Sequence, residues 1–118
     1  MSWNIEFYKT EGGRAPAEEF LDSLPLKHRT KARFVIDLLA EYGPLLKAPF
    51  TKHLLGTRLK ELRIQASPNI YRIFYFAYVD RKFVLLHAFT KKTEQTPRNE
   101  IEIAENRMNN YVRRYKND

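Results

Sequence analysis

Cysteine is absent from the 118-residue sequence, which excludes a disulfide scaffold, thiolate catalysis and a cysteine-ligated zinc site. Long apolar runs are absent as well, because the longest candidate, residues 70–79, is interrupted by Arg72 and is too short to span a bilayer. The N-terminus does not have the basic and apolar segments of a signal peptide. We therefore expect a soluble, cytoplasmic protein with no membrane partner.

Residues that break regular structure are few, with four Gly and six Pro, and no internal repeat or low-complexity tract is visible. Hydrophobic residues make up 43% of the chain and aromatic residues 14%, which argues against disorder. A chain of this length fits one domain, and such a domain buries roughly two thirds of the surface that its unfolded chain exposes. We therefore expect a single domain over residues 1–118.

The positive charge is concentrated in the centre of the chain. Residues 47–98 contain eleven basic and three acidic residues, whereas the rest of the chain contains ten basic and eleven acidic residues. Charge concentrated in this way indicates an electropositive surface with an anionic partner. The alternative is a solvated sheet edge whose lysines discourage edge-to-edge pairing.

The apolar periodicity predicts an α+β fold with the element order β-α-α-β-β-β-α. Pro16 and Pro25 suit the first turns of two helices, which we expect to form a hairpin, and Gly43 ends the second helix. The expected elements, in chain order, are a strand at residues 3–8, helices that begin at 16 and 25, an ordered loop at 44–56, strands at 58–66, 70–78 and 83–90, and a last helix from 97.

Arg72 lies in the almost wholly apolar run of residues 70–78, where an unpaired buried charge is costly. Arg63 has the same character in the preceding strand. On neighbouring antiparallel strands the two guanidinium groups can approach each other, and their planar forks suit phosphate. Three interpretations stay open: a phosphate site on an open face of the sheet, which we favour, an interior ion pair with Glu61, or solvated side chains.

Further candidates lie near the ends of the predicted strands. Lys91 and Lys92 follow the last strand, where they either extend the phosphate surface or form a solvated loop. Lys52 and His53 precede the three strands, and His53 is either a proton-transfer group or merely exposed. His87 lies within an apolar strand, where a half-buried structural histidine is the favoured interpretation.

A metal centre is not expected, because the three His are scattered and few acidic residues are clustered. No cofactor is expected either, since the sequence contains no GxGxxG or GxxxxGK[ST] motif, and the GxSxG nucleophile motif is also absent. Tyr71 can stack on a nucleic-acid base, although a tyrosine in a central strand is more often part of the core.

These residues belong to a combined pattern that extends over nearly the whole chain. It consists of Leu62-Arg63-Ile64, Tyr71-Arg72-Ile73-Phe74-Tyr75-Phe76, residues 84–93, Thr96-Pro97 and Ile101-Glu102-Ile103-Ala104. The pattern resembles the RelE/ParE superfamily of bacterial toxins, and it looks most like the HigB-type, phage-related branch. The resemblance implies a RelE-like, mainly antiparallel sheet with a helical hairpin on one face, a basic cleft on the other and a C-terminal helix.

The resemblance also implies a partner and a set of site residues. In HigB-type pairs the partner is usually a helix-turn-helix antitoxin. Glu61 occupies the position of a strand lysine in RelE, and residues 93–96 offer no counterpart to a RelE tyrosine. A loop histidine often acts in HigB-type members, and His53 is the nearest one here. The catalytic candidates are therefore Arg63, Arg72, Lys91, Lys92, His53 and Glu61.

We predict that the chain is a metal-independent mRNA interferase, the toxin of a type II toxin–antitoxin system, acting on ribosome-bound mRNA. The RNA-binding candidates are Lys52, Arg58, Lys60 and Tyr71. Two alternatives remain because the superfamily also contains gyrase poisons: a ParE-like DNA gyrase inhibitor, and a non-toxic, phage-related RNA-binding module.

Overall fold

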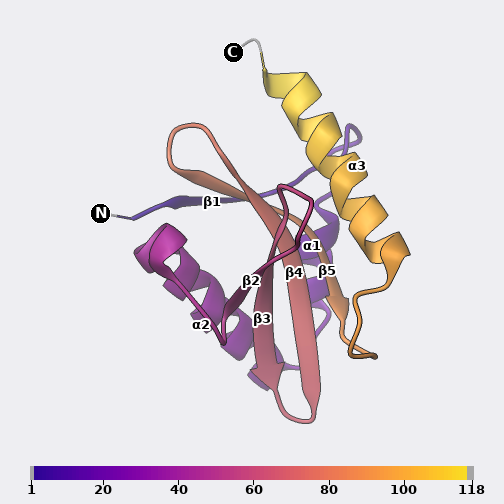
Figure 1. Ribbon diagram of the computed structural model, residues 1–118. Helices are drawn as coiled ribbons and strands as arrows, with labels where there is room; N and C mark the ends of the chain where they lie inside the picture. The colour runs from indigo at the N-terminus through magenta and orange to yellow at the C-terminus, as the bar shows by residue number, and fades with distance from the viewer. Residues whose placement is uncertain (1, 117–118) are drawn as a thin grey trace.

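The computed structural model describes residues 2–116 and arranges them as one sheet with helices on both faces (Figure 1). Its elements, in chain order, are β1 (Asn4–Phe7), α1 (Pro16–Asp22), α2 (Leu26–Tyr42), the short 3-10 helix η1 (Gly43–Leu45), β2 (Thr51–His53), β3 (Lys60–Ala66), β4 (Asn69–Tyr78), β5 (Lys82–Thr90) and α3 (Arg98–Tyr115).

The five strands form one open sheet in the order β1-β5-β4-β3-β2. The neighbours β2 to β5 pair antiparallel, and β1 lies parallel to β5. The predicted α+β class and mainly antiparallel sheet are confirmed. The prediction of a loop over residues 44–56 was wrong in part, because this segment contains η1 and the edge strand β2.

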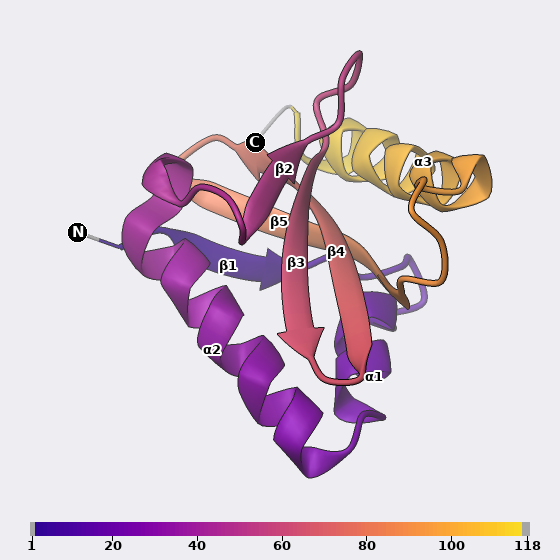
Figure 2. The ribbon, with the colours of Figure 1, turned by 60° about the horizontal axis from the view of Figure 1, so that its bottom comes forward.

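The two faces of the sheet bury different sets of side chains. One apolar cluster joins the sheet to α1 and α2 and includes Leu62 and Ile73, whereas the other joins it to α3 and includes Phe74 and Phe76. Side chains alternate between the faces along a strand, so β4, which contributes to both clusters, has to be apolar at nearly every position. Figure 2 shows α2 along one side of the sheet and α3 on the other.

The helix α3 changes the expected shape of the second face. The resemblance implied a basic cleft there, but Ala104, Met108 and Tyr111 of α3 are buried against the sheet. A cavity lies at the end of β5, where the chain crosses to α3, and Phe20 of α1 also lines it.

Gly43, at the C-terminal end of α2, packs closely against Trp3, the residue before β1. Its φ of 56° lies in the region that favours glycine, and a Cβ at this position would lie 2.5 Å from Nε1 of Trp3. Trp3 in turn stacks on Phe83 at 4.4 Å between ring centroids, and its backbone N–H donates to the carbonyl of Ala40. The close approach of the indole ring therefore requires glycine at the end of α2.

Candidate functional site

Arg63 and Arg72 are direct cross-strand partners on β3 and β4. Paired residues of an antiparallel ladder point to the same face, so both guanidinium groups lie on the α3 side. This agrees with the prediction that the two groups approach each other across neighbouring strands. Glu61, two residues before Arg63, points to that face as well. These three side chains form the charged cluster of the sheet.

Glu61 and Arg72 are almost completely buried, at 1% and 2% exposure. The Arg72 Nε lies 3.4 Å from Oε2 of Glu61, and an Nη nitrogen of Arg63 lies 3.8 Å from the same oxygen. The expectation that Arg72 points out of an open sheet face was therefore wrong. The interior ion pair with Glu61 is the observed arrangement.

The outer end of the Arg72 guanidinium contacts the segment that joins β5 to α3. Its Nη1 donates to Oγ1 of Thr96 at 2.7 Å, and its Nη2 donates to the carbonyl of Glu94 at 3.4 Å. The Nε side of the Arg72 guanidinium therefore faces Glu61, and its two Nη nitrogens contact the segment between β5 and α3. Arg72 is held rigidly at the point where the sheet meets this segment.

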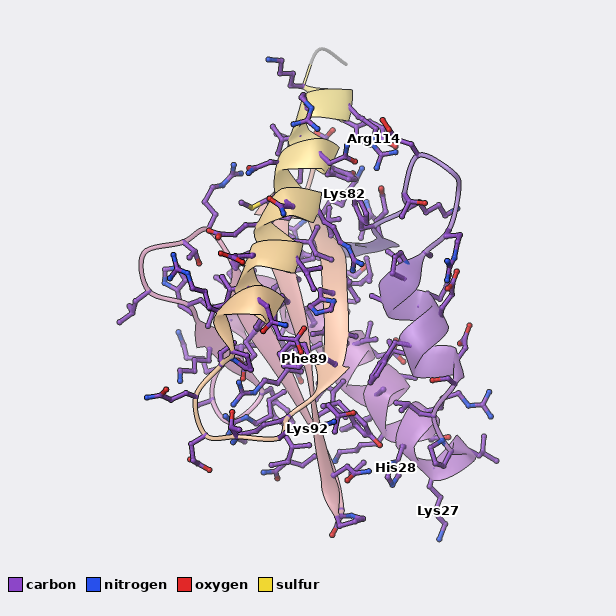
Figure 3. All side chains as sticks on the ribbon, turned by 90° about the vertical axis from the view of Figure 1, so that its right-hand side faces the viewer. Lys27, His28, Lys82, Phe89, Lys92 and Arg114 are labelled. Carbon is purple, nitrogen blue, oxygen red and sulfur yellow. The ribbon has the colours of Figure 1, made fainter. Side chains whose placement is uncertain are left out.

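A cavity of about 310 Å³ opens beside this guanidinium. Figure 3 shows Phe89 near the start of α3 and Lys92 in the segment after β5. The cavity is lined by Phe20, Arg72, Phe89, Thr90, Lys91, Lys92, Thr93, Pro97 and Glu100. It therefore brings together Arg72, Lys91 and Lys92, three of the basic candidates from the sequence.

Lys91 is the more constrained of the two lysines. Its side chain is 14% exposed and its Nζ lies 3.9 Å from the carboxylate of the exposed Glu94, whereas Lys92 is exposed. The backbone N–H of Lys91 donates to the carbonyl of Ile70, which extends the β4–β5 contact past the end of β5. The peptide of Lys91 is thus fixed by the sheet.

Sequence reasoning missed a further feature of the cavity, the pairing of Glu100, which lines it, with His87, which does not. His87 Nε2 lies 2.7 Å from Oε1 of Glu100, which belongs to the first turn of α3. Burial lowers the pKa of His87, and the Glu100 carboxylate partly opposes that shift. The other ring nitrogen, Nδ1, lies 3.4 Å from Nη1 of Arg107. A neutral imidazole that donates from Nε2 and accepts at Nδ1 fits both neighbours.

Tyr71 does not belong to this site. It is 2% exposed and packs in the core on the α1 and α2 side, where its ring meets Phe20 edge to face. Its hydroxyl lies 2.6 Å from Nδ1 of His28 on α2. The prediction that Tyr71 contacts RNA is therefore contradicted, because neither face of the ring is accessible for stacking.

His53 lies apart from the arginine cluster. It is paired with Lys60 at the exposed sheet edge, so its side chain leaves β2 on the face opposite to Arg63 and Arg72. Its Nε2 lies 3.0 Å from the carbonyl of Thr57. His53, Lys60 and Lys52 line a shallow depression of about 250 Å³ near η1. The structure therefore does not bring His53 to the cavity beside Arg72.

Arg58 precedes β3 and is exposed at the same end of the sheet as β2. Its guanidinium lies 5.4 Å from the ring centroid of Phe76, a cation–π distance. Among residues 2–116 no group of three or more His, Asp or Glu side chains is arranged to hold a metal ion. None of the helices in the described range has the length and apolar character that a bilayer crossing needs.

A five-stranded, mostly antiparallel open sheet with helices on both faces is consistent with the RelE-like fold. Residues 19–109, from α1 into α3, match the family described as Phage derived protein Gp49-like (DUF891). The chain belongs to this Gp49-like family, a RelE-like toxin family related to the toxins of toxin–antitoxin systems. A comparison with curated proteins finds no match.

Proposed function

We propose that the chain is the toxin of a type II toxin–antitoxin system and that it cleaves ribosome-bound mRNA without a metal ion. One observation carries the proposal: a cavity at the end of β5 is lined by Arg72 and two lysines and also by the carboxylate of Glu100. Fixed cations beside a group that can take a proton are what cleavage of a phosphodiester requires. Membership of the Gp49-like family supports a toxin of this kind.

In the proposed reaction the 2′-hydroxyl of one nucleotide attacks its own 3′ phosphate, and negative charge develops on the phosphate oxygens. Arg72 is suited to stabilise this charge because Glu61 and Thr96 already hold its guanidinium in place. A donor that is fixed before the reaction has no reorganisation cost in the transition state. Lys91, Lys92 and the partly exposed Arg63 add further positive charge.

Basic side chains at and near the β2 edge, two of them exposed and Lys60 half-buried, bind the RNA backbone in this proposal. Lys52, Arg58 and Lys60 provide salt-dependent contacts to phosphates outside the cavity. His53, which lies beside Lys60, joins this group instead of the catalytic one. Tyr71 has no part in RNA binding because it is buried.

The proposed partner is a helix-turn-helix antitoxin that docks on α2. This helix presents Leu26 and Phe34, which are 69% and 52% exposed, beside the basic residues Lys27, Lys31 and Arg33. Figure 3 shows Lys27 at the first turn of α2. An acidic, partly apolar segment is complementary to this surface and leaves the cavity open.

Induced expression with mapping of mRNA 5′ ends tests the proposal. We expect new 5′ ends within translated codons, and the same cleavage of mRNA by purified protein only when ribosomes are present. Lys92→Ala, at an exposed position, should lower the cleavage rate without altering the fold. Growth arrest with intact mRNA and inhibited gyrase would instead identify a ParE-like inhibitor, and unimpaired growth would identify a non-toxic RNA-binding module.

A further inference from the structure

We propose that Glu100 is the general base of the cleavage reaction and that His87 is the residue that positions it. The inference rests on the proposed function and names the group that receives the 2′-hydroxyl proton. It starts from Glu100, which lines the cavity together with Arg72 and the two lysines, and from its contact with His87 at 2.7 Å.

The position of Glu100 suits this role. Its side chain is 22% exposed and lines the cavity, so a substrate atom in the cavity can reach the carboxylate. The imidazole of His87 holds Oε1, and this leaves Oε2 to accept a proton. Since Glu100 belongs to the first turn of α3, its backbone is fixed by the helix, which packs on the sheet.

The other acidic residues near the cavity are less suited. Glu61 is 1% exposed, does not line the cavity and is engaged by two guanidinium groups. The side chain of Glu94 is 98% exposed, so no wall of the protein fixes its orientation. Of these three carboxylates, Glu100 alone is both accessible from the cavity and oriented by a hydrogen bond.

His87 is itself not free to take the proton. Its Nε2 is engaged by Glu100, and its Nδ1 faces Arg107, whose guanidinium also donates to the carbonyl of Leu86. The ring stacks on Phe89, with centroids 5.3 Å apart and planes inclined by 23°. The hydrogen bond and the stacking restrict the imidazole to one orientation, and in that orientation its Nε2 fixes the position of the Glu100 carboxylate.

The Glu100 carboxylate takes the 2′-hydroxyl proton while the 2′-oxygen forms a bond to phosphorus. The bond from phosphorus to the 5′-oxygen breaks with its electron pair, and the leaving oxygen takes a proton from water. The products are a 2′,3′-cyclic phosphate and a 5′-hydroxyl end, and the proton on Glu100 returns to solvent.

The test is the single-turnover cleavage of ribosome-bound mRNA by the full chain over a range of pH. Glutamine keeps a carbonyl oxygen that accepts from His87 but does not take a proton. We therefore expect Glu100→Gln to fold normally and to cleave on the order of a hundredfold more slowly. Its rate should also lose the rise with pH that deprotonation of a base produces. The matched control, Glu102→Gln on the same helix, changes an exposed carboxylate and should cleave at the wild-type rate.

His87 is tested through rescue. His87→Ala removes the donor to Glu100 and should slow cleavage, whereas His87→Gln keeps an N–H in the place of Nε2 and should recover most of the rate. If Glu100→Gln does not fold, Glu100→Asp replaces it: the shorter acid should slow cleavage and retain the rise with pH.

Three outcomes separate the two proposals. Loss of the rise with pH in folded Glu100→Gln, with wild-type activity intact, supports Glu100 as the base. A folded Glu100→Gln or Glu100→Asp variant that cleaves as fast as the wild type overturns that assignment and reduces the contact with His87 to a clamp between β5 and α3. Failure of the wild-type protein itself to cleave ribosome-bound mRNA overturns the proposed function, and with it the role of Glu100.

Discussion

Removing one member of the buried Arg72–Glu61 pair should destabilise the protein strongly. Both side chains are almost completely buried, and Nε and Oε2 are 3.4 Å apart. In Arg72→Met the carboxylate of Glu61 remains buried, with only the more distant Arg63 to compensate it. In Glu61→Leu the guanidinium of Arg72 remains buried without a carboxylate partner. Each single variant therefore leaves an uncompensated charge in the interior.

The cost of such a charge is about 3–5 kcal/mol, whereas replacement of a whole buried pair by apolar side chains is often neutral or stabilising. Arg72→Met also loses the hydrogen bonds to Thr96 and to the carbonyl of Glu94, so we place it at the upper end of this range. For a domain of this size, roughly 4 °C in Tm corresponds to each kcal/mol. The single variants should then melt about 12–20 °C below the wild type.

The assay is a double-mutant cycle measured by urea unfolding of the wild type, both single variants and the double variant. We expect the double variant to be more stable than either single variant, so the coupling energy should exceed the cost of the costlier single variant, about 5 kcal/mol. Arg63 and Lys91 are left unchanged, so that the four proteins differ only at Arg72 and Glu61. A cost below about 1 kcal/mol for Arg72→Met would refute the buried pair and restore an accessible arginine.

Three further predictions concern other parts of the molecule. Gly43→Ala should destabilise the protein by about 1–3 kcal/mol, because a Cβ there meets the ring of Trp3 and the backbone conformation favours glycine. Urea unfolding measures the free energy of unfolding, and an unchanged value would contradict the close contact of Gly43 with Trp3. Burial lowers the pKa of His87 below its ordinary value of 6.5, so the unfolded chain binds more protons as pH falls through this value and stability decreases. His87→Gln should therefore lose less Tm than the wild type between pH 7 and about pH 5, and parallel curves would contradict this. Charge reversal at Lys27 and Lys31 should weaken antitoxin binding more than charge removal in the cavity does, measured at one ionic strength, and the opposite ranking would mean that the antitoxin covers the cavity.

The sequence predicted the fold well wherever structure follows from local periodicity. The apolar run of β4 and the stripe of α2 predicted a central strand and an amphipathic helix, and both are present. Strand β2 was missed because its three residues are too few for a periodic pattern and because it forms only by pairing with β3. The parallel contact of β1 with β5 is equally non-local, since two α-helices, the 3-10 helix η1 and three strands lie between the two strands in the chain.

The candidate site was predicted only in part, because some of its contacts join segments that are far apart in the chain. The approach of Arg63 and Arg72 followed from simple antiparallel pairing, but the outer contacts of Arg72 are with the segment that joins β5 to α3, and no local pattern encodes where that segment lies. The contact of His87 with Glu100 joins β5 to α3. A histidine inside a buried apolar strand was the available signal, because a buried imidazole needs a hydrogen-bond partner.

The parallel pairing of β1 with β5 has a consequence for the newly made chain. Strand β1 lacks its partner until residues 82–85 of β5 have been added, and closing so long a loop slows folding. The cavity forms later still, because Glu100 and Pro97 in its wall follow β5 in the chain. A translation product that ends before α3 therefore has neither the complete cavity nor the helix that buries one face of its sheet, so any activity that depends on the cavity arises only after α3 has been made.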